Sequence, residues 1–512
     1  MLWKTCEKNG LLGKSILKKS YFIQSRNFFC SDFFMVYLLR IIKKTFSAIC
    51  ENKNKKVLVN MRIQVPEDVK YIIEKLNNAG YEAYAVGGCI RDSILGRIPD
   101  DWDITTSAKP EEIKELFPKT IDTGIQHGTV TVMRNHVGYE VTTYRIDGEY
   151  EDSRHPKEVI FTSNLLEDLK RRDFTINAMA YNHLEDDGQE DNLKGLVDAF
   201  EGIKDLQEKK IRCVGNAIHR FEEDALRMMR AVRFSAQLGY EIEEETAEAV
   251  KALAENLKNI SAERIQVELV KLLVSDHPDY LRKAYELGMT KVFFPEFDKA
   301  CETKQNNPHH IYTVGEHMLQ SLEYVRADKV LRLTMILHDI AKPETIFAGE
   351  DGVDHFYGHP EKGAEMAKAI LRRLRFDNDT INKVYKLVKY HDRKLSQKPE
   401  KLRKAIVEIG PELFPMLLEV KKADMLAQSM YKREEKEQEL RDLHQLYEKI
   451  LEEKNCLSLK DLALDGKDLI SLGMKPGKEL GETLQILFDY VLENPDKNTK
   501  EELEAYLQKI RS

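Results

Sequence analysis

The sequence predicts an α+β protein in which a small, mixed β-sheet domain precedes an elongated, all-α remainder. Two observations support this fold class. Segments with the alternation of a β-strand, "YEAYAVGG", "GTVTVMR" and "YEVTTYR", all lie between residues 81 and 145. Beyond residue 202, apolar residues recur at helical spacing instead, as in "FEEDALRMMRAVRFSAQLG" and "VRADKVLRLTMILHDIAK". We therefore expect the sheet to be confined to the first part of the chain.

Length and composition describe an ordinary globular chain of several domains. With 512 residues the chain is too long to fold around a single hydrophobic core, since domains hold roughly 150 residues each. The seven cysteines include no Cys-x-x-Cys pair, which excludes a zinc ribbon and favours a reducing cytoplasm. The apolar run "FFMVYLLRII" is shorter than the roughly 18 residues of a membrane-spanning helix, so we expect no membrane association.

Residues 1–60 form a basic extension that we expect to lie outside the folded protein. They hold 12 Lys/Arg against three Asp/Glu, a net charge of +9. Two interpretations remain open, a targeting leader and an upstream translation start with the working protein beginning at Met61. The other expected boundaries are a sheet domain over 61–200 and helical segments over 201–305, 306–400 and 401–512.

The stretch "VGGCIRDSILGRIPDDWDITT" combines a glycine turn with paired acids. If "DWDI" is a strand, Asp101 and Asp103 face the same way and repel each other unless a cation lies between them. Mg²⁺ suits this position, because it takes oxygen ligands and shares them with substrate phosphates. The preceding Gly87-Gly88 turn would let backbone N–H groups approach a triphosphate, and Arg91 adds positive charge. In "GYEVTTYR", Glu140 is the candidate for a third acid. The alternative is an ordinary surface strand.

A second segment, "EDALRMMRAVRF", is a candidate for selecting the nucleotide. On a helix, Asp224 and Arg227 would share one face, and Arg230 and Arg233 would continue it. A carboxylate beside a guanidinium matches the amino group and ring nitrogen of adenine and cytosine, whereas guanine and uracil present a carbonyl beside an N–H. Such a pair would accept A and C without a template. The alternative is an intrahelical ladder of ion pairs.

Taken in order, "GGCIRD", "DWD", "RRDFTINA", "DAFEGIKDLQEKKIRCVG" and "EDALRMMRAVRF" resemble the motifs of class II tRNA nucleotidyltransferases, the CCA-adding enzymes and their bacterial poly(A) polymerase relatives. The resemblance implies a nucleotidyltransferase head with a helical neck, body and tail. It also implies Mg²⁺-dependent transfer of CMP and AMP from CTP and ATP to a tRNA 3′ end, with Asp101 and Asp103 binding the metal. Arg172 and Asp173 lie where the family recognises the ribose. The positions expected to contact the nucleotide are Gly88, Arg91, Arg172, Asp224, Arg227, Arg230 and Arg233.

Histidines and acids in the third segment indicate a second site. "TVGEHMLQSL", "MILHDIAKPE", "HFYGHPEKGAEMA" and "LVKYHDRK" place imidazoles and carboxylates on several expected helices, a donor set that suits a divalent transition metal. The order resembles the HD phosphohydrolase superfamily, which also occurs fused within some CCA enzymes. The expected metal ligands are His317, His338, Asp339 and Asp392, with His359 and His391 for a second metal or for phosphate.

Three functions remain open at this stage. The first is CCA addition to tRNA. The second is a poly(A) polymerase or an A-adding enzyme, which would share every head motif. The third makes the HD region the main activity, with the head as a tRNA-binding module. The segment "LDGKDLISLGMKPGKELGETLQ" is similar to the family region that holds the tRNA body, and a plain helix-packing unit explains it equally well.

Overall fold

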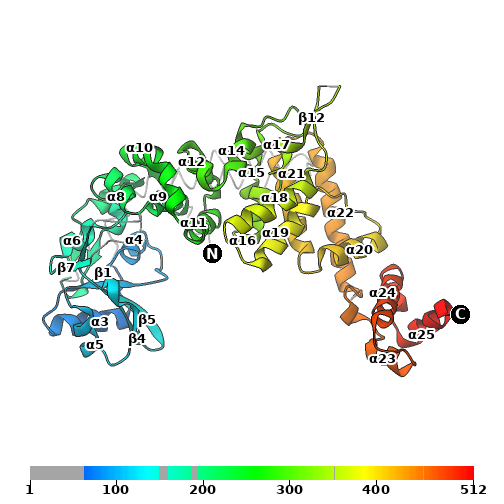
Figure 1. Ribbon diagram of the computed structural model, residues 1–512, viewed down its shortest axis with the longest axis horizontal. Coiled ribbons are helices and arrows are strands. Elements are labelled where there is room, and N and C mark those ends of the chain that lie inside the picture. The colour runs from blue at the N-terminus through cyan, green and yellow to red at the C-terminus, as the bar shows by residue number, and fades with distance from the viewer. Residues whose placement is uncertain (1–62, 149–158, 186–193, 351, 454, 512) are drawn as a thin grey trace, which may run out of the picture.

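The structure is a computed structural model that describes residues 63–148, 159–185, 194–350, 352–453 and 455–511. The predicted basic extension lies outside these residues. The molecule is an elongated arch, with the sheet domain at one end and the last helices at the other (Figure 1). The α+β fold class is confirmed, because the large sheet forms before residue 200 and helices dominate the rest.

The head is a seven-stranded mixed sheet in the order β3-β4-β5-β2-β1-β8-β9. Its central strands β2 and β5 are parallel, and the pairs that flank them are antiparallel. β4 and β5 form the expected hairpin, in which Asn135 and His136 make the turn with positive φ. The strands are β1 (Ala83–Val86), β2 (Asp103–Thr106), β3 (Thr120–Gly124), β4 (Thr129–Arg134), β5 (Val137–Thr143), β8 (Ala180–Tyr181) and β9 (Leu196–Val197).

Helices cover both faces of this sheet. α3 packs on β1 and β2, and α5 packs on β4. The opposite side is closed by Leu165 and Leu169 of α6, which pack with Tyr84 and Tyr144. A two-stranded sheet, β6 (Arg145–Asp147) with β7 (Val159–Phe161), lies beside α6. The head helices are α3 (Glu67–Asn78), α4 (Gly88–Ile94), α5 (Pro110–Leu116), α6 (Leu165–Lys170) and α7 (Gly202–Glu208).

The neck follows as a series of helices that share one continuous core with the head. Two residues of β10 (Lys210–Ile211) pair in parallel with β11 (Glu241–Ile242), a pairing too short for the sequence pattern to reveal. The neck helices are α8 (Ala217–Glu223), α9 (Leu226–Leu238), α10 (Glu244–Leu253), α11 (Ala262–Leu273), α12 (Leu281–Glu286), α13 (Thr290–Phe293) and α14 (Pro295–Glu302).

The body and tail complete the arch. A β-hairpin of β12 (Ile346–Ala348) and β13 (Asp354–Phe356), which was not expected, interrupts the body helices. The body helices are α15 (Val314–Leu322), α16 (Lys329–Leu337), α17 (Lys342–Thr345), α18 (His359–Arg373), α19 (Asn378–Tyr390), α20 (Pro399–Ile409), α21 (Phe414–Ala427) and α22 (Arg433–Glu452). The tail, α23 (Gly466–Ser471), α24 (Lys478–Glu493) and α25 (Lys500–Arg511), has a separate core.

None of the helices described here has the length and apolar character required to cross a membrane.

Candidate functional site

The paired acids lie at the start of the central strand β2. Asp103 is its first residue, and Asp101 lies two residues before it. Both acids are exposed, whereas Trp102 between them is only 9% exposed and joins the core. The burial pattern therefore matches the alternation that the sequence predicts, although Asp101 lies just outside the strand.

Glu140 lies beside this pair on β5. The parallel register joins Ile104 to Val141, so Asp103 and Glu140, each one residue earlier, are at the same level of neighbouring strands. Burial raises the pKa of Glu140, and the charges of Asp103 and Asp101 raise it further. Enclosure by the surrounding protein likewise raises the pKa of Asp103, although part of the residue is exposed. The three carboxylates thus repel one another, which a bound cation would relieve.

The glycine turn places a guanidinium next to these acids. Gly87 has φ +87°, and a β-carbon built on it would lie 2.9 Å from Arg172 Nη1. Only glycine combines this backbone conformation with so close an approach. Arg172 Nε is buried and has no hydrogen-bond partner among the described residues, and the Arg172 charge lowers the pKa of Asp103. Arg172 Nη2 lies 3.8 Å from Asp168 Oδ2, so Nε is the part of the guanidinium left without a partner. A guanidinium with an unused donor beside these acids is suited to an anion that shares a cation with them.

Arg91 and Asp173 belong to one buried network. Arg91 Nη1 donates to Asn177 Oδ1 at 2.6 Å, and Asn177 Nδ2 donates to Asp173 Oδ1 at 3.0 Å. Arg230 of α9 donates to Asp173 Oδ2 at 2.7 Å. Burial raises the pKa of Asp173, but the Arg230 charge and the hydrogen bonds from Asn177 and Arg230 outweigh it and lower the net pKa. The network thereby ties the neck helix to the head.

The expectation that Asp224 and Arg227 share a helix face is wrong. The helix is interrupted at Asp224, between α8 and α9, where the backbone is extended with φ −142° and ψ 102°. Its carboxylate accepts from Leu226 N at 3.0 Å, which caps the following helix. Arg227 instead contacts Glu223 and donates to the Arg171 carbonyl at 3.0 Å. The two residues remain neighbours in space, because the Arg227 backbone N–H donates to the Asp224 carbonyl at 3.0 Å.

Two residues of α11 that the sequence analysis missed hold this region in place. Arg264 Nη2 donates to Asp224 Oδ2 at 2.7 Å, and its Nη1 donates to Oδ1 at 3.2 Å. Glu268 Oε2 lies 2.7 Å from Arg233 Nε. Arg233 is nearly buried and also lies over the Phe234 ring. Glu268 is buried on an amphipathic helix, and a charged residue on the apolar side was the one signal that could have revealed it.

In the body, four histidines converge on Asp339. His317 Nε2 and His338 Nε2 lie 3.5 and 3.3 Å from Asp339 Oδ2. His359 Nε2 and His391 Nε2 each lie 3.5 Å from the other oxygen, Oδ1. Asp339 therefore stands between two histidine pairs. Groups of three or more ligand residues with atoms within 4.8 Å of one another occur, among the residues described, only at these two places.

The imidazole rings are oriented by the backbone. His338, His359 and His391 each place Nδ1 at 2.7–2.8 Å from the carbonyl three residues earlier, which directs Nε2 inward. Metal-binding histidines characteristically make such a hydrogen bond through the ring nitrogen that does not bind the metal, because it sets both the tautomer and the orientation of the ring. The Nε2 atoms of His317 and His338 are 3.2 Å apart. Two neighbouring ligands, each about 2.1 Å from a metal, have nearly this separation.

The structure does not bring Asp392 into this cluster. The additional carboxylate is Asp424 of α21, whose Oδ1 lies 2.9 Å from His317 Nε2 and 3.7 Å from His338 Nε2. Asp392 follows His391, two residues beyond the end of α19, and is exposed; it belongs to neither group of candidate metal ligands. The missed signal was an acid within a helix that is otherwise apolar on most sides. Asp424 lies beyond residue 400, so this carboxylate comes from outside the segment in which the sequence analysis expected the metal ligands.

The donor set fits a divalent transition metal. It consists of imidazoles and carboxylates, and Asp339 Oδ2 is buried without a hydrogen bond of good geometry. Lys342 Nζ lies 2.6 Å from that oxygen. Burial lowers the pKa of His338, but the Asp339 charge and hydrogen bonds to both carboxylates raise it to about 10. A metal ion would take the place of this proton.

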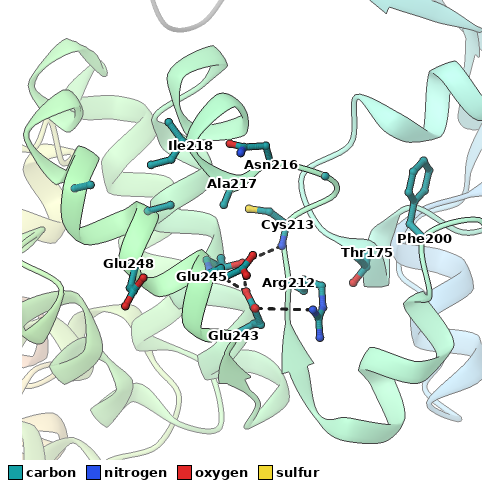
Figure 2. A pocket seen from close by; sticks show the side chains of 14 residues that line it. Thr175, Phe200, Arg212, Cys213, Asn216, Ala217, Ile218, Glu243, Glu245 and Glu248 are labelled. Atoms are coloured by element: carbon teal, nitrogen blue, oxygen red, sulfur yellow. Dashed lines mark hydrogen bonds and ion pairs between the residues drawn. The ribbon is translucent and has the colours of Figure 1, made fainter.

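A cavity of about 470 Å³ lies where the head meets the neck. Its walls include Thr175, Cys213 and Glu243 and none of the predicted site residues (Figure 2). Glu243 caps α10 by accepting from Thr246 N, and it also lies 3.8 Å from Arg212 Nη1. Because these charges satisfy one another, we assign no ligand to this cavity.

Comparison with known families accounts for most of the chain. The poly A polymerase head domain matches residues 83–212. A domain described as the probable RNA and SrmB-binding site of polymerase A matches 239–301, and a putative domain 2 of tRNA nucleotidyltransferases matches 361–507. The matched regions cover most of the sheet, part of the neck, the second half of the body and the tail, in the order in which the structure arranges them.

Individual proteins are similar along nearly their whole length. The CCA-adding enzyme of Lactobacillus helveticus is 36% identical over 447 residues, 86% of this chain and 96% of that protein. That of Lactobacillus delbrueckii subsp. bulgaricus is 35% identical over 454 residues, 88% of this chain and 100% of that protein. The crystal structure of the Bacillus stearothermophilus CCA-adding enzyme in complex with CTP has a TM-score of 0.64 at 27% identity, covering 88% and 98% of the two chains.

Proposed function

The chain belongs to the family of CCA-adding enzymes, and from this premise we propose which of its residues carry out the reaction. The activity is a nucleotidyl transfer that adds CMP and AMP, from CTP and ATP, to the 3′ end of tRNA. We assign the chemistry to the acid cluster of Asp101, Asp103 and Glu140 and the selection of the nucleotide to the junction of α8 and α9.

The acid cluster would hold Mg²⁺ together with the triphosphate of the incoming nucleotide. Bound there, Mg²⁺ would supply positive charge to the reacting phosphate and lower the pKa of the attacking hydroxyl. The chain itself would contribute the orientation of the triphosphate, because Arg172 lies against Gly87 and the turn follows Val86, which pairs with Asp103. The observation that carries this assignment is the buried, unpaired Arg172 Nε next to Asp103.

Nucleotide selection would depend on Asp224 and Arg227. Each is already held by a partner, Asp224 by Arg264 and Arg227 by Glu223, so neither side chain is free to rotate. An acceptor and a donor presented together to one base edge would accept cytosine and adenine and leave guanine and uracil with unmatched polar groups, which costs about 1–3 kcal/mol for each unsatisfied group. Arg172 and Asp173, linked to α9 through Arg230, would meet the ribose.

The decisive experiment supplies the purified chain with Mg²⁺ and three tRNA transcripts, ending before CCA, after C and after CC. Each nucleoside triphosphate is given alone and in mixture. We expect ordered addition of C, C and A followed by a stop. Unlimited A addition would identify a poly(A) polymerase, and A addition only to the transcript ending in CC would identify an A-adding enzyme.

We propose a metal-dependent phosphohydrolase as a second function of the body. The convergence of four imidazoles on Asp339, with Asp424 at its side, supports this proposal. His317, His338, Asp339 and Asp424 would hold one transition-metal ion, and His359, His391 and the other Asp339 oxygen would hold a second. Bound metal would supply a Lewis acid to a phosphate ester. Manganese, iron and zinc should be tested separately, with release of phosphate as the measurement.

We also propose the cytoplasm as the compartment of this activity. The described cysteines, Cys89, Cys213, Cys301 and Cys456, are all free, as in proteins kept in a reducing environment. Fractionation of cells that express the tagged, full-length chain would test this assignment, and recovery in an organelle or membrane fraction would contradict it.

A further inference from the structure

We propose that Asp168, a buried acid of the head that would touch neither metal nor nucleotide, is a positioning residue that keeps Arg172 away from Asp103 and so leaves Asp103 available to the metal. This inference rests on the proposed metal site of the head. Asp168 belongs to α6 and is 0% exposed. The sequence analysis did not single it out, because it lies within a run of charged residues just before Arg171 and Arg172.

Asp168 lies beneath the acid cluster, on the same side of the sheet. Its Oδ2 accepts a hydrogen bond at 3.0 Å from the Thr105 hydroxyl. Thr105 follows Asp103 by two residues on β2, and residues two apart on a strand face the same way, about 6.6 Å from each other. Thr105 is fully buried, whereas Asp103 is exposed. The carboxylate of Asp168 is therefore one step deeper in the head than the acids that would hold the metal.

Both oxygens of Asp168 are already engaged by the protein. Oδ1 accepts from Arg171 Nε at 2.9 Å and from Arg171 Nη2 at 2.7 Å, and the backbone N–H of Arg145 lies 3.4 Å away. Oδ2 accepts from Thr105 and lies 3.8 Å from Arg172 Nη2. A fully buried carboxylate with these partners is unsuited to hold a metal ion, but its charge stabilises the two guanidinium groups beside it.

Arg172 lies between two acids that differ in their other partners. Among the described residues, its ion pair is with Asp168, but its charge also lowers the pKa of Asp103. Burial lowers the pKa of Arg172, and the charge of Asp168 opposes this more strongly than those of Asp103 and Asp173 do. Asp173 is bound by Arg230 at 2.7 Å. If Asp168 lost its charge, Asp103 would be the acid left for Arg172 to pair with.

A guanidinium paired with Asp103 would compete with the metal ion. Both are cations, and a carboxylate oxygen that accepts from a guanidinium is not free to bind a metal with the same lone pair. By holding Nη2, Asp168 keeps the Arg172 charge near the acid cluster without letting it occupy Asp103. The unpartnered Nε then remains available to an anion. The position of Arg172 would thus allow metal and triphosphate to bind together.

The test measures metal binding in the head without any turnover. Tb³⁺ takes oxygen ligands, as Mg²⁺ does, and it luminesces after energy transfer from a nearby tryptophan. Trp102 lies between Asp101 and Asp103, and the other tryptophan of the chain, Trp3, lies in the basic extension, so the signal reports on the acid cluster. The full-length chain is treated with chelator and titrated with Tb³⁺ in the absence of nucleotide.

Asp168→Asn keeps the size of the side chain and removes its charge. It should weaken Tb³⁺ binding at least about tenfold, because Arg172 would then turn to Asp103. Asp168→Glu, which keeps the charge, should retain most of the affinity. Glu167→Gln alters an acid on the same helix that pairs with Lys170, at the surface, and should bind as the unchanged chain does. Equal affinities in Asp168→Asn and Glu167→Gln would overturn the proposal.

A second variant shows whether Asp168 acts through Arg172. Arg172→Met removes the competing cation, so it should bind Tb³⁺ at least as tightly as the unchanged chain does. Adding Asp168→Asn to Arg172→Met should then change the affinity by no more than about twofold, because a residue that acts through a partner loses its effect when the partner is absent. Weaker binding by Arg172→Met alone, which does not depend on the folding of Asp168→Asn, would overturn the proposal.

The dependence of the reaction on Mg²⁺ supplies a separate readout. In Asp168→Asn, the free Mg²⁺ required for half-maximal CMP incorporation should rise at least about tenfold, with kcat recovered at saturating Mg²⁺. A loss of kcat that excess Mg²⁺ does not restore would indicate a structural role and overturn the proposal. Asp103→Ala distinguishes failure of the underlying site. A Tb³⁺ signal retained in Asp103→Ala would overturn the metal site itself, whereas loss of that signal with unchanged affinity in Asp168→Asn would overturn only the role of Asp168.

Discussion

Asp424 Oδ1 lies 2.9 Å from His317 Nε2, across 107 residues of chain. The two residues belong to α21 and α15, which pack directly against each other. Burial raises the pKa of Asp424, but hydrogen bonds from His317 and His338 lower it well below its usual range. The carboxylate is thus ionised and aimed at the imidazoles, as a metal ligand must be.

The first prediction tests this contact directly. Asp424→Asn should reduce the affinity of the body for Mn²⁺, Fe²⁺ or Zn²⁺ by at least about 10- to 100-fold, because the amide carries no charge and binds metal weakly. Asp392→Asn, which alters an exposed acid outside the cluster, should retain the metal. The metal content of each variant after dialysis, measured by mass spectrometry, shows whether Asp424 or Asp392 binds the metal. Loss of metal in Asp392→Asn alone would restore the assignment made from sequence.

The second prediction concerns the acids of the head. Asp103→Ala and Asp101→Ala should each lower the rate of CMP incorporation about a thousandfold or more, since metal-ion charge at a reacting phosphate contributes several kcal/mol. Asp100→Ala removes a neighbouring exposed acid and should leave the rate within about twofold. Phosphate release by the body should persist in all three variants. Normal incorporation by Asp103→Ala would contradict the site assignment.

The third prediction uses two glycines with nearly equal φ angles. Gly87 has φ +87° and Gly80 has φ +90°, but only a β-carbon on Gly87 would meet Arg172, at 2.9 Å. Both alanine variants should lose about 1–2 kcal/mol of stability from the left-handed backbone. Gly87→Ala should in addition displace Arg172 and raise the KM for CTP and ATP about tenfold. Equal KM values in thermally matched samples would show that Arg172 does not contact the nucleotide.

The fourth prediction is a dependence of stability on pH. The net pKa of Asp173 in the folded chain is below its unfolded value of about 3.9, because Arg230 and Asn177 bind the carboxylate. A lowered folded pKa contributes stability that is present above the unfolded pKa and is lost as pH falls through the folded value. The melting temperature of the unchanged chain should therefore approach that of Asp173→Asn as pH falls from 5 to 3. A constant difference over this range would contradict the role of the ion pair.

Short stretches of the sequence determined the fold class and much of the local structure at the head site. The α+β class, the β4–β5 hairpin, the glycine turn and the exposure of Asp101 and Asp103 on either side of Trp102 all follow from patterns within a few residues. Alternation and helical periodicity report which side of an element is buried, and turn residues report where it ends. The inward histidines of the body likewise follow from their apolar surroundings.

Which distant residues contact one another in the two sites was decided by the tertiary structure alone. Arg264 holds Asp224 across 40 residues, and Asp424 reaches His317 from a helix in the segment that the sequence analysis set apart as 401–512. The helix break at Asp224 also depends on context, since its carboxylate caps α9 while Arg264 holds it from α11. The physical reason is that periodicity identifies a buried face but not the helix that covers it. Which distant charge meets Asp224 or His317 is set by how the helices pack in space.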